Sequence, residues 1–226
     1  MCGRFSFVTS KEKIKQQLGE QMETGVNLRI SFNVAPTQHA YVVTNDKPNM
    51  LQYLTWGLIP YWSKEEESAG KLINARQEGI FSKPSFRIPI RKRRCLVLAD
   101  SFYEWKKIGD QKIPYRIFHK NGDLLVLAGI WDIWHKDAYA VKSFSIITTP
   151  PNKEMSSVHN RMPVVLQQKA DQKKWLGEIS LDETVQLMQT PADGLLDMYQ
   201  VSTKVNNVRN DSPDLHQKLA EPPTLF

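Results

Sequence analysis

Short apolar blocks, rich in β-branched and aromatic residues, follow one another through the middle of the chain. Such blocks are typical of β-strands when turn-forming residues separate them. Turn signals do separate them here, for example IGDQ at 108–111 and KNGD at 120–123. The pattern therefore predicts strands in these segments: 40–44, 51–57, 95–100, 102–107, 113–119, 124–134 and 144–149.

Helical patterns are found on the two flanks of this strand-rich region. Thr9 and Glu12 have the spacing of a capping box, which predicts a short helix within residues 9–21. Segments 169–179 and 181–190 also have a helical pattern. Strands in the middle and helices at the flanks favour an α+β fold with an antiparallel, barrel-like sheet over a parallel α/β sheet.

The chain shows no internal repeat, no low-complexity linker and no change of composition that would mark a domain boundary. We therefore expect a single domain over residues 1–226. The last residues, 221–226, are expected to be a loose tail.

Composition narrows the class of protein without naming a function. Hydrophobic residues make up 41% of the 226 residues and charged residues 24%, which is ordinary for a globular protein with a real core. No apolar run approaches the roughly 20 residues that span a bilayer, and no signal peptide is visible, so we expect a cytoplasmic protein without a membrane partner. Two cysteines without a CxxC pair argue against a disulfide framework or a zinc site, and we expect neither metal nor cofactor.

The net charge of +6 favours an acidic partner such as nucleic acid, but only mildly. The run RKRR at 91–94 has two interpretations, a solvated face or a contact to phosphate. Charge alone therefore does not identify a partner.

Cys2 is the first residue that suggests particular chemistry. Chain ends are usually frayed, so a cysteine there is poorly placed to fill a core. A small second residue allows aminopeptidases to remove Met1, and we expect the mature chain to begin at Cys2. Cys2 would then carry an α-amine and a thiol on adjacent carbons, two nucleophiles that no other position offers.

Several polar residues lie in apolar contexts, and each has an unremarkable alternative. Glu104, between Tyr103 and Trp105, is also what the solvent face of a half-exposed strand would show. Asn74 in LINARQE is also a typical turn or cap residue. His159 before an apolar strand is also a common kind of loop histidine. Trp62 in TWGLIPYW is also a plausible core residue, so no single position is specific.

The order of these segments along the chain is specific. MCGRF, NVAPT, WGLIPYW, INARQE, FYEWKK and VHNRMPVVL follow one another between Cys2 and about residue 207. In this series the chain resembles the SOS-response-associated peptidase (SRAP) family, whose members process abasic sites in DNA. The resemblance covers nearly the whole chain, and we see no departure at the motif positions.

The resemblance implies a fold, a partner and a reaction. The expected fold is a single α+β domain with a curved β-sheet core and a positively charged cleft. The expected partner is single-stranded DNA that contains an abasic site, which a monomer is sufficient to bind. The expected reaction links the N-terminal cysteine to the lesion through a thiazolidine ring and so shields it.

The chemistry of a 1,2-aminothiol is consistent with this reaction. An amine attacks the open aldehyde of the sugar to give a Schiff base, and the neighbouring thiol then closes a five-membered ring intramolecularly. A reference pKa of roughly 7.7–8.0 leaves a useful share of the α-amine neutral at cellular pH. The thiol, with a reference pKa of about 8.5, is a few per cent thiolate unless a neighbouring cation assists it.

The same resemblance assigns roles to individual residues. Glu104 would act as general acid and base, and His159 as a second proton carrier near the sugar oxygen. Asn74 would hydrogen-bond either the Cys2 backbone or the lesion. The remaining motif residues would contact DNA: Arg4, Arg76 and Arg161 the flanking phosphates, and Trp62 and Pro36 the adjacent bases.

Three alternatives stay open at this point. An N-terminal cysteine with Asn and Glu nearby also resembles N-terminal-nucleophile hydrolases, which would make the protein a peptidase or autopeptidase. A single-strand DNA-binding module without a covalent step is the second alternative, and an α+β domain with a structural Cys2 is the third. Only the crosslinking hypothesis predicts a covalent adduct with abasic DNA and none with intact DNA.

Overall fold

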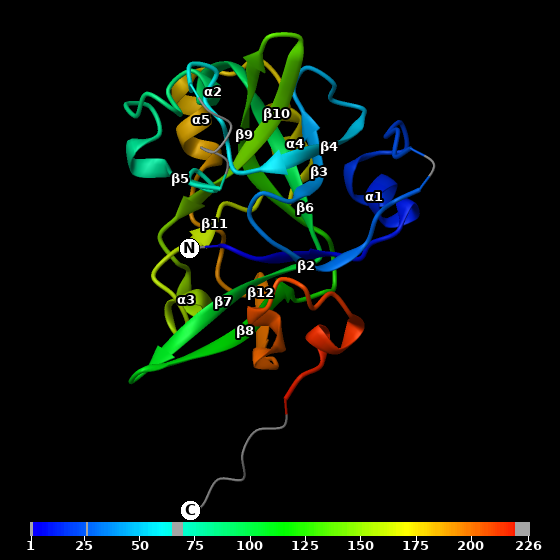
Figure 1. Ribbon diagram of the computed structural model, residues 1–226, viewed down its shortest axis with the longest axis vertical. Coiled ribbons are helices and arrows are strands. Elements are labelled where there is room, and N and C mark those ends of the chain that lie inside the picture. The colour runs from blue at the N-terminus through cyan, green and yellow to red at the C-terminus, as the bar shows by residue number, and fades with distance from the viewer. Residues whose placement is uncertain (1, 26, 65–69, 220–226) are drawn as a thin grey trace, which may run out of the picture.

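The computed structural model of the chain describes residues 2–25, 27–64 and 70–219. Within this range, five strands close into a barrel in the upper half of Figure 1, in the order β10-β4-β3-β6-β9 with a further β9–β10 pairing. They are β3 (His39–Thr44), β4 (Leu51–Trp56), β6 (Arg94–Ala99), β9 (Leu125–Lys136) and β10 (Tyr139–Thr149). The β10–β4 pairing is parallel and the others are antiparallel. The predicted α+β fold with a barrel-like, mainly antiparallel sheet is confirmed.

A second sheet lies below the barrel in Figure 1, with the strand order β12-β8-β7-β1-β2. Its strands are β1 (Phe5–Phe7), β2 (Ser31–Val34), β7 (Ser101–Ile108), β8 (Gln111–His119) and β12 (Leu196–Gln200). Two short strands, β5 (Asn74–Arg76) and β11 (Met162–Pro163), pair with β10. The short strands β1, β2, β5, β11 and β12 were not predicted from the sequence.

Helices lie around the two sheets: α1 (Lys11–Leu18), α2 (Pro89–Lys92), α3 (Lys153–Ser156), α4 (Lys169–Leu176) and α5 (Leu181–Leu187). Short 3-10 helices span Gln77–Gly79, Thr203–Asn206 and Pro213–His216. The predicted capping box of Thr9 and Glu12 is wrong, because α1 begins after Ser10, whose side chain accepts the Lys13 amide as the N-cap. The predicted tail at 221–226 lies outside the described residues.

Successive side chains along a barrel strand point to opposite faces, and each face belongs to its own apolar cluster. On β6, Cys95, Val97 and Ala99 belong to the cluster that also contains Cys2. The intervening Leu96 and Leu98 belong to the cluster that the helices cover. Because both faces of the barrel strands are buried, these strands read as continuous apolar blocks in the sequence.

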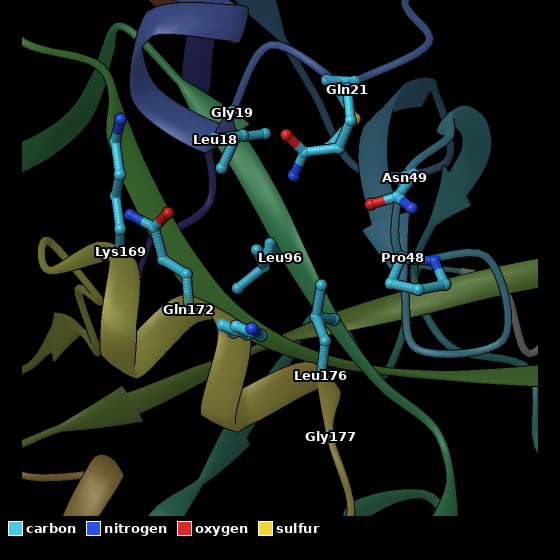
Figure 2. A pocket seen from close by; sticks show the side chains of 12 residues that line it. Leu18, Gly19, Gln21, Pro48, Asn49, Leu96, Lys169, Gln172, Leu176 and Gly177 are labelled. Carbon is cyan, nitrogen blue, oxygen red and sulfur yellow. The ribbon is translucent and has the colours of Figure 1, made fainter.

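The helix side of the barrel contains a cavity of about 580 Å³ between α1, α4 and the loop that joins β3 to β4 (Figure 2). Apolar side chains such as Leu18, Leu96 and Leu176 line it, and Lys169 and Gln172 stand near them. None of the site residues predicted from the sequence lines this cavity. Figure 1 shows α1 to the right of the barrel, away from β11 and β5 on its left.

In the described part of the chain, no helix has both the length and the apolar character needed to cross a bilayer. Among the described residues, the longest helices have 8 residues. About 20 apolar residues would be required for a span.

A substitution at Gly129 on β9 would test how tightly the barrel is packed. A Cβ at this position would lie 2.8 Å from the Cys95 sulfur and 3.1 Å from the backbone oxygen of Ser145. Gly129→Ala should therefore lower the free energy of unfolding by about 1–3 kcal/mol, the usual cost of overpacking a core. Urea denaturation measures this loss.

Gly177→Ala, after the last residue of α4, is the matched control. Its added Cβ meets the nearest atoms at 3.5 Å, an ordinary contact. We expect its free energy of unfolding to change by less than about 0.5 kcal/mol. Equal stabilities of the two variants would contradict the tight packing at Gly129.

Candidate active site

The start of the chain runs into the apolar core instead of fraying. Phe5 of β1 pairs with Phe102 of β7, and the Tyr103 amide donates to the Arg4 carbonyl at 2.9 Å. This contact brings the residues that precede β1 to the middle of β7, where the charge of Glu104 acts on the Cys2 thiol. Cys2 is fully buried, so the expectation that this end is poorly placed to fill a core is wrong.

Asn74 holds the backbone of Cys2. Its position is set by β5, where Asn74 pairs with Ile146 of β10 in parallel register. The side-chain Nδ2 donates to the Cys2 carbonyl oxygen at 2.8 Å. The other amide atom, Oδ1, is buried and accepts no hydrogen bond from the residues that the structure describes. The site therefore keeps one buried acceptor beside Cys2, and the role of Asn74 in a reaction stays a prediction.

Glu104 and His159 face each other beside Cys2. Glu104 on β7 is only 2% exposed, so the alternative of a solvent-facing glutamate is wrong. His159, after α3, places its Nε2 4.0 Å from the Glu104 Oε2. One bridging water, or a small tightening of the contact, would complete a hydrogen bond between them.

Two backbone groups of Arg161 contact the His159 ring at Nδ1. The Arg161 amide donates to the His159 Nδ1 at 3.1 Å, which requires an unprotonated Nδ1. The Arg161 carbonyl lies farther from the same nitrogen, at 3.3 Å. The amide contact suits a ring that carries its proton on Nε2, toward Glu104, and the carbonyl contact suits one that carries it on Nδ1. The role of His159 as a proton carrier stays a prediction.

The thiol of Cys2 is protonated in this setting. Burial raises its pKa above the ordinary value, and the negative charge of Glu104 raises it further. The thiol is therefore a weak nucleophile until a base removes its proton.

Solvent reaches the pair of Glu104 and His159 through a hollow of about 480 Å³. The other side chains that line it are those of Trp105, Lys107, Lys112 and Asn206. Among the described residues, no three His, Cys, Asp or Glu side chains gather as the ligands of a metal ion would.

Two of the arginines predicted to contact phosphate lie on neighbouring segments. Arg76 is exposed on β5, where it pairs with Thr148 of β10. Arg161 donates to the Thr148 carbonyl oxygen at 2.6 Å and forms a two-pronged ion pair with Glu78. The Arg161 guanidinium lowers the pKa of the Glu78 carboxyl group. Arg161 is thus already paired with one carboxylate, and its contact to phosphate stays a prediction.

Trp62 is 53% exposed on the loop that follows β4, so its interpretation as a core residue is wrong. Side chains of β9 fix the backbone of this loop. The Asp132 carboxylate accepts from the Tyr61 amide at 3.1 Å, and the Trp134 indole donates to the Ser63 carbonyl at 2.7 Å. An exposed ring on a fixed loop is suited to stacking on a base. Pro36, half-buried between β2 and β3, and Trp62 remain predicted base contacts.

Arg4 is buried, and its guanidinium group donates hydrogen bonds to other parts of the protein. Its Nη1 donates to the Asn33 Oδ1 at 2.8 Å and to the Val205 carbonyl at 2.7 Å. Asn33 in turn donates to the carbonyl of Asn210 at 2.7 Å. This geometry favours a role for Arg4 in holding residues 205–210 against the second sheet over a contact to DNA.

The structure brings three further residues to the hollow. Lys107, Lys112 and Asn206 were not among the predicted site residues. The signal for the two lysines is the two-residue turn Gly109-Asp110, which places Lys107 opposite Lys112 in the β7–β8 hairpin. For Asn206, which accepts from the Trp105 indole at 2.8 Å, the sequence carries no signal that we recognise.

Comparison with known proteins agrees with the order of the motifs. A family profile described as SOS response associated peptidase (SRAP) matches residues 1–208. The chain belongs to this family. The SRAP profile covers every predicted site residue, from Cys2 to Arg161.

Relatives of this SRAP protein match it along most of its length. The Bacillus subtilis (strain 168) protein "Abasic site processing protein YoqW" is 40% identical over 221 residues, 95% of this chain and 98% of YoqW. The Gallus gallus protein "Abasic site processing protein HMCES" is 32% identical over 260 residues, 95% of this chain and 76% of HMCES. A crystal structure of a protein from Bacteroides thetaiotaomicron has a TM-score of 0.86 and 29% identity, and the match covers 97% of this chain and 100% of that one.

Arg4→Gln distinguishes a structural arginine from a phosphate contact. The substitution removes a buried guanidinium and leaves the acceptors on Asn33 and Val205 short of a donor. We expect the free energy of unfolding to fall by about 2 kcal/mol, in the range for buried charged hydrogen bonds. The salt dependence of DNA binding should stay as in the native protein. A shallower salt dependence with unchanged stability would instead place Arg4 on the DNA.

Proposed function

We propose that this protein processes abasic sites in single-stranded DNA by forming a covalent thiazolidine link between Cys2 and the aldehyde of the lesion. Relatives named abasic site processing proteins match 95% of the chain at 40% and 32% identity. The single observation that carries the proposal is the placement of Cys2, whose carbonyl is held by Asn74 at 2.8 Å beside the buried Glu104.

The first step is the attack of the α-amine, exposed by loss of Met1, on the aldehyde carbon. The nitrogen–carbon bond forms, the oxygen takes a proton, and water then leaves to give the Schiff base. Glu104 and the Nε2 proton of His159 supply and collect these protons, which is the work of a general acid and base. The buried Oδ1 of Asn74 is available to accept a hydrogen bond from the amine and so to orient it.

The second step closes the ring. The Cys2 sulfur attacks the Schiff-base carbon, the thiol proton is lost, and the ring nitrogen gains a proton. No other group leaves, so the product keeps the DNA strand intact. Because burial and Glu104 raise the pKa of the thiol, we infer that the amine reacts first and that Glu104 removes the thiol proton afterwards.

The DNA strand on either side of the lesion would be held through contacts that do not depend on base sequence. Arg76 and Arg161 would bind flanking phosphates, and Trp62 and Pro36 would contact neighbouring bases. A phosphate near Arg161 would compete with Glu78 for its guanidinium, because both are anions that match its two-pronged geometry.

A peptidase activity is the second candidate, since the family description names a peptidase. An N-terminal-nucleophile hydrolase would also use the α-amine and thiol of Cys2. The raised pKa of the thiol favours the amine as the first nucleophile and so the aldehyde reaction. Denaturing electrophoresis with an abasic oligonucleotide separates the two functions, because only crosslinking gives an adduct with abasic DNA and none with intact DNA.

Two Cys2 variants separate the roles of the amine and the thiol. Cys2→Ser keeps the amine, so a Schiff base should still form and be trapped by borohydride, but no heat-stable adduct should survive. An extra residue retained before Cys2 keeps the thiol and displaces the amine, so it should also lose the stable adduct. Denaturing electrophoresis with and without borohydride measures both, and intact-mass spectrometry verifies each N-terminus.

The outcomes contrast with those of the rival mechanisms. If the thiol alone attacked the aldehyde, the extended variant would keep much of its activity. If Cys2 were only structural, Cys2→Ser would leave adduct formation unchanged. A heat-stable adduct from either variant at the native rate would rule out the thiazolidine mechanism.

Glu104→Gln keeps the shape of the side chain and removes its proton-transfer capacity. General acids and bases typically contribute about 10²- to 10⁴-fold in rate, so crosslinking at saturating abasic DNA should slow by that factor. Affinity for an intact strand should change far less. Glu12→Gln, on the exposed surface of α1, is the matched control and should leave both quantities unchanged. Equal losses of rate and affinity would place Glu104 in binding or folding.

A further inference from the structure

The β7–β8 hairpin carries an unfavourable pair of like charges. Lys107 of β7 lies directly opposite Lys112 of β8 in the antiparallel register, and both side chains are exposed. Neither lysine forms an ion pair with any residue in the described part of the chain. Like charges directly opposite each other destabilise a sheet. The stability of the fold therefore does not account for this pair of lysines.

The hairpin extends beyond the rest of its sheet. β1 pairs with β7 only at Ser101 and Phe102, although β7 continues to Ile108. Figure 1 shows the end of the β7–β8 hairpin reaching away from the barrel at the lower left. The two lysines therefore lie on a projecting ribbon with solvent around it.

The lysines nevertheless belong to the active-site hollow. Lys107 and Lys112 line the same space of about 480 Å³ as Glu104 and His159. Lys107 follows Glu104 by three positions, about 10 Å along an extended strand. The Trp105 indole between them is held in place by its 2.8 Å hydrogen bond to the Asn206 side chain.

We propose that Lys107 and Lys112 form a clamp for the phosphate backbone of the DNA strand beside the lesion. This inference rests on the proposed function for the lesion itself, and adds the place where the flanking strand is held. Two ammonium groups at the outer end of a hollow attract an anion, while the buried Glu104 at the inner end repels one. A DNA strand with an abasic site fits both ends of the hollow. Its charged phosphates would meet the lysines, and its neutral aldehyde sugar would meet Glu104.

The clamp explains the tolerated repulsion between the lysines. Bound phosphate oxygens would neutralise both ammonium groups, so the electrostatic cost exists only in the free protein. The contact is to backbone, so it would be independent of base sequence. Two lysines acting as point charges also suit a flexible single strand, which presents its phosphates in variable orientations.

The test is a double variant, Lys107→Gln with Lys112→Gln, whose binding to an intact single-stranded oligonucleotide is measured at several salt concentrations. Each single-strand phosphate contact contributes about 0.7 to the slope of log K against log salt, so losing two should make the slope shallower by about 1.4. The melting temperature should be equal or higher, because a repulsive pair has been removed.

The matched control is Lys169→Gln with Lys173→Gln on α4. These lysines line the cavity of Figure 2, so the variant loses the same charge on the helix side of the barrel. It should keep the native salt slope. Equal slope changes in the two double variants would show a general field effect and overturn the clamp. So would a lower crosslinking rate with unchanged affinity.

The binding measurement uses a strand without a lesion, so it does not depend on the covalent step. A protein that fails to crosslink abasic DNA but shows the shallower slope would refute the proposed function and keep the clamp. A protein that crosslinks with an unchanged slope in the hairpin variant would refute the clamp and keep the proposed function.

Discussion

The hydrogen bond between the Asn74 side chain and the Cys2 carbonyl is the contact on which the site depends. It joins the first described residue of the chain to β5, and β5 is fixed by its pairing with β10. A free chain end would lose this position to conformational entropy. Burial among apolar side chains and the 2.8 Å hydrogen bond together hold Cys2 in one place. An intramolecular ring closure gains its rate from such fixed geometry.

Strand β10 places most of the remaining groups. Along its length it pairs with the end of β4, then with β5, and finally with β11, which follows Arg161. The Trp62 loop leaves from β4, and Asn74 and Arg76 lie on β5. Residues that are far apart in sequence thus become neighbours along this one strand, at about 3.3 Å per residue. The closed barrel makes this strand rigid, because it is paired on both sides.

The electrostatics of the site divide it into two zones. The inner zone holds the buried carboxylate of Glu104, which favours a protonated thiol and repels other anions. The outer zone holds Lys107 and Lys112, which attract anions. A negatively charged polymer with one neutral, reactive sugar fits this division. The neutral lesion can approach Glu104 while the charged backbone stays outside.

The amino-acid sequence by itself determined the longer strands, the helices α1, α4 and α5, and the α+β class, because apolar blocks and turn residues are local signals. It also determined which residues were candidates, through the order of the motifs from Cys2 to Arg161. It did not determine the short strands β5 and β11, whose three and two residues have no periodicity and pair only because β10 is already in place.

Only the tertiary structure decided what each candidate faces. Alternation on β7 could not tell a buried Glu104 from an exposed one, because residues 101–104 are buried on both faces of the strand. Arg4 and Arg161 look alike in sequence, yet the first is enclosed by Asn33 and Val205 and the second is paired with Glu78. Burial and hydrogen-bond partners depend on contacts between segments up to 201 residues apart, as between Arg4 and Val205, and local sequence patterns carry no information about such contacts.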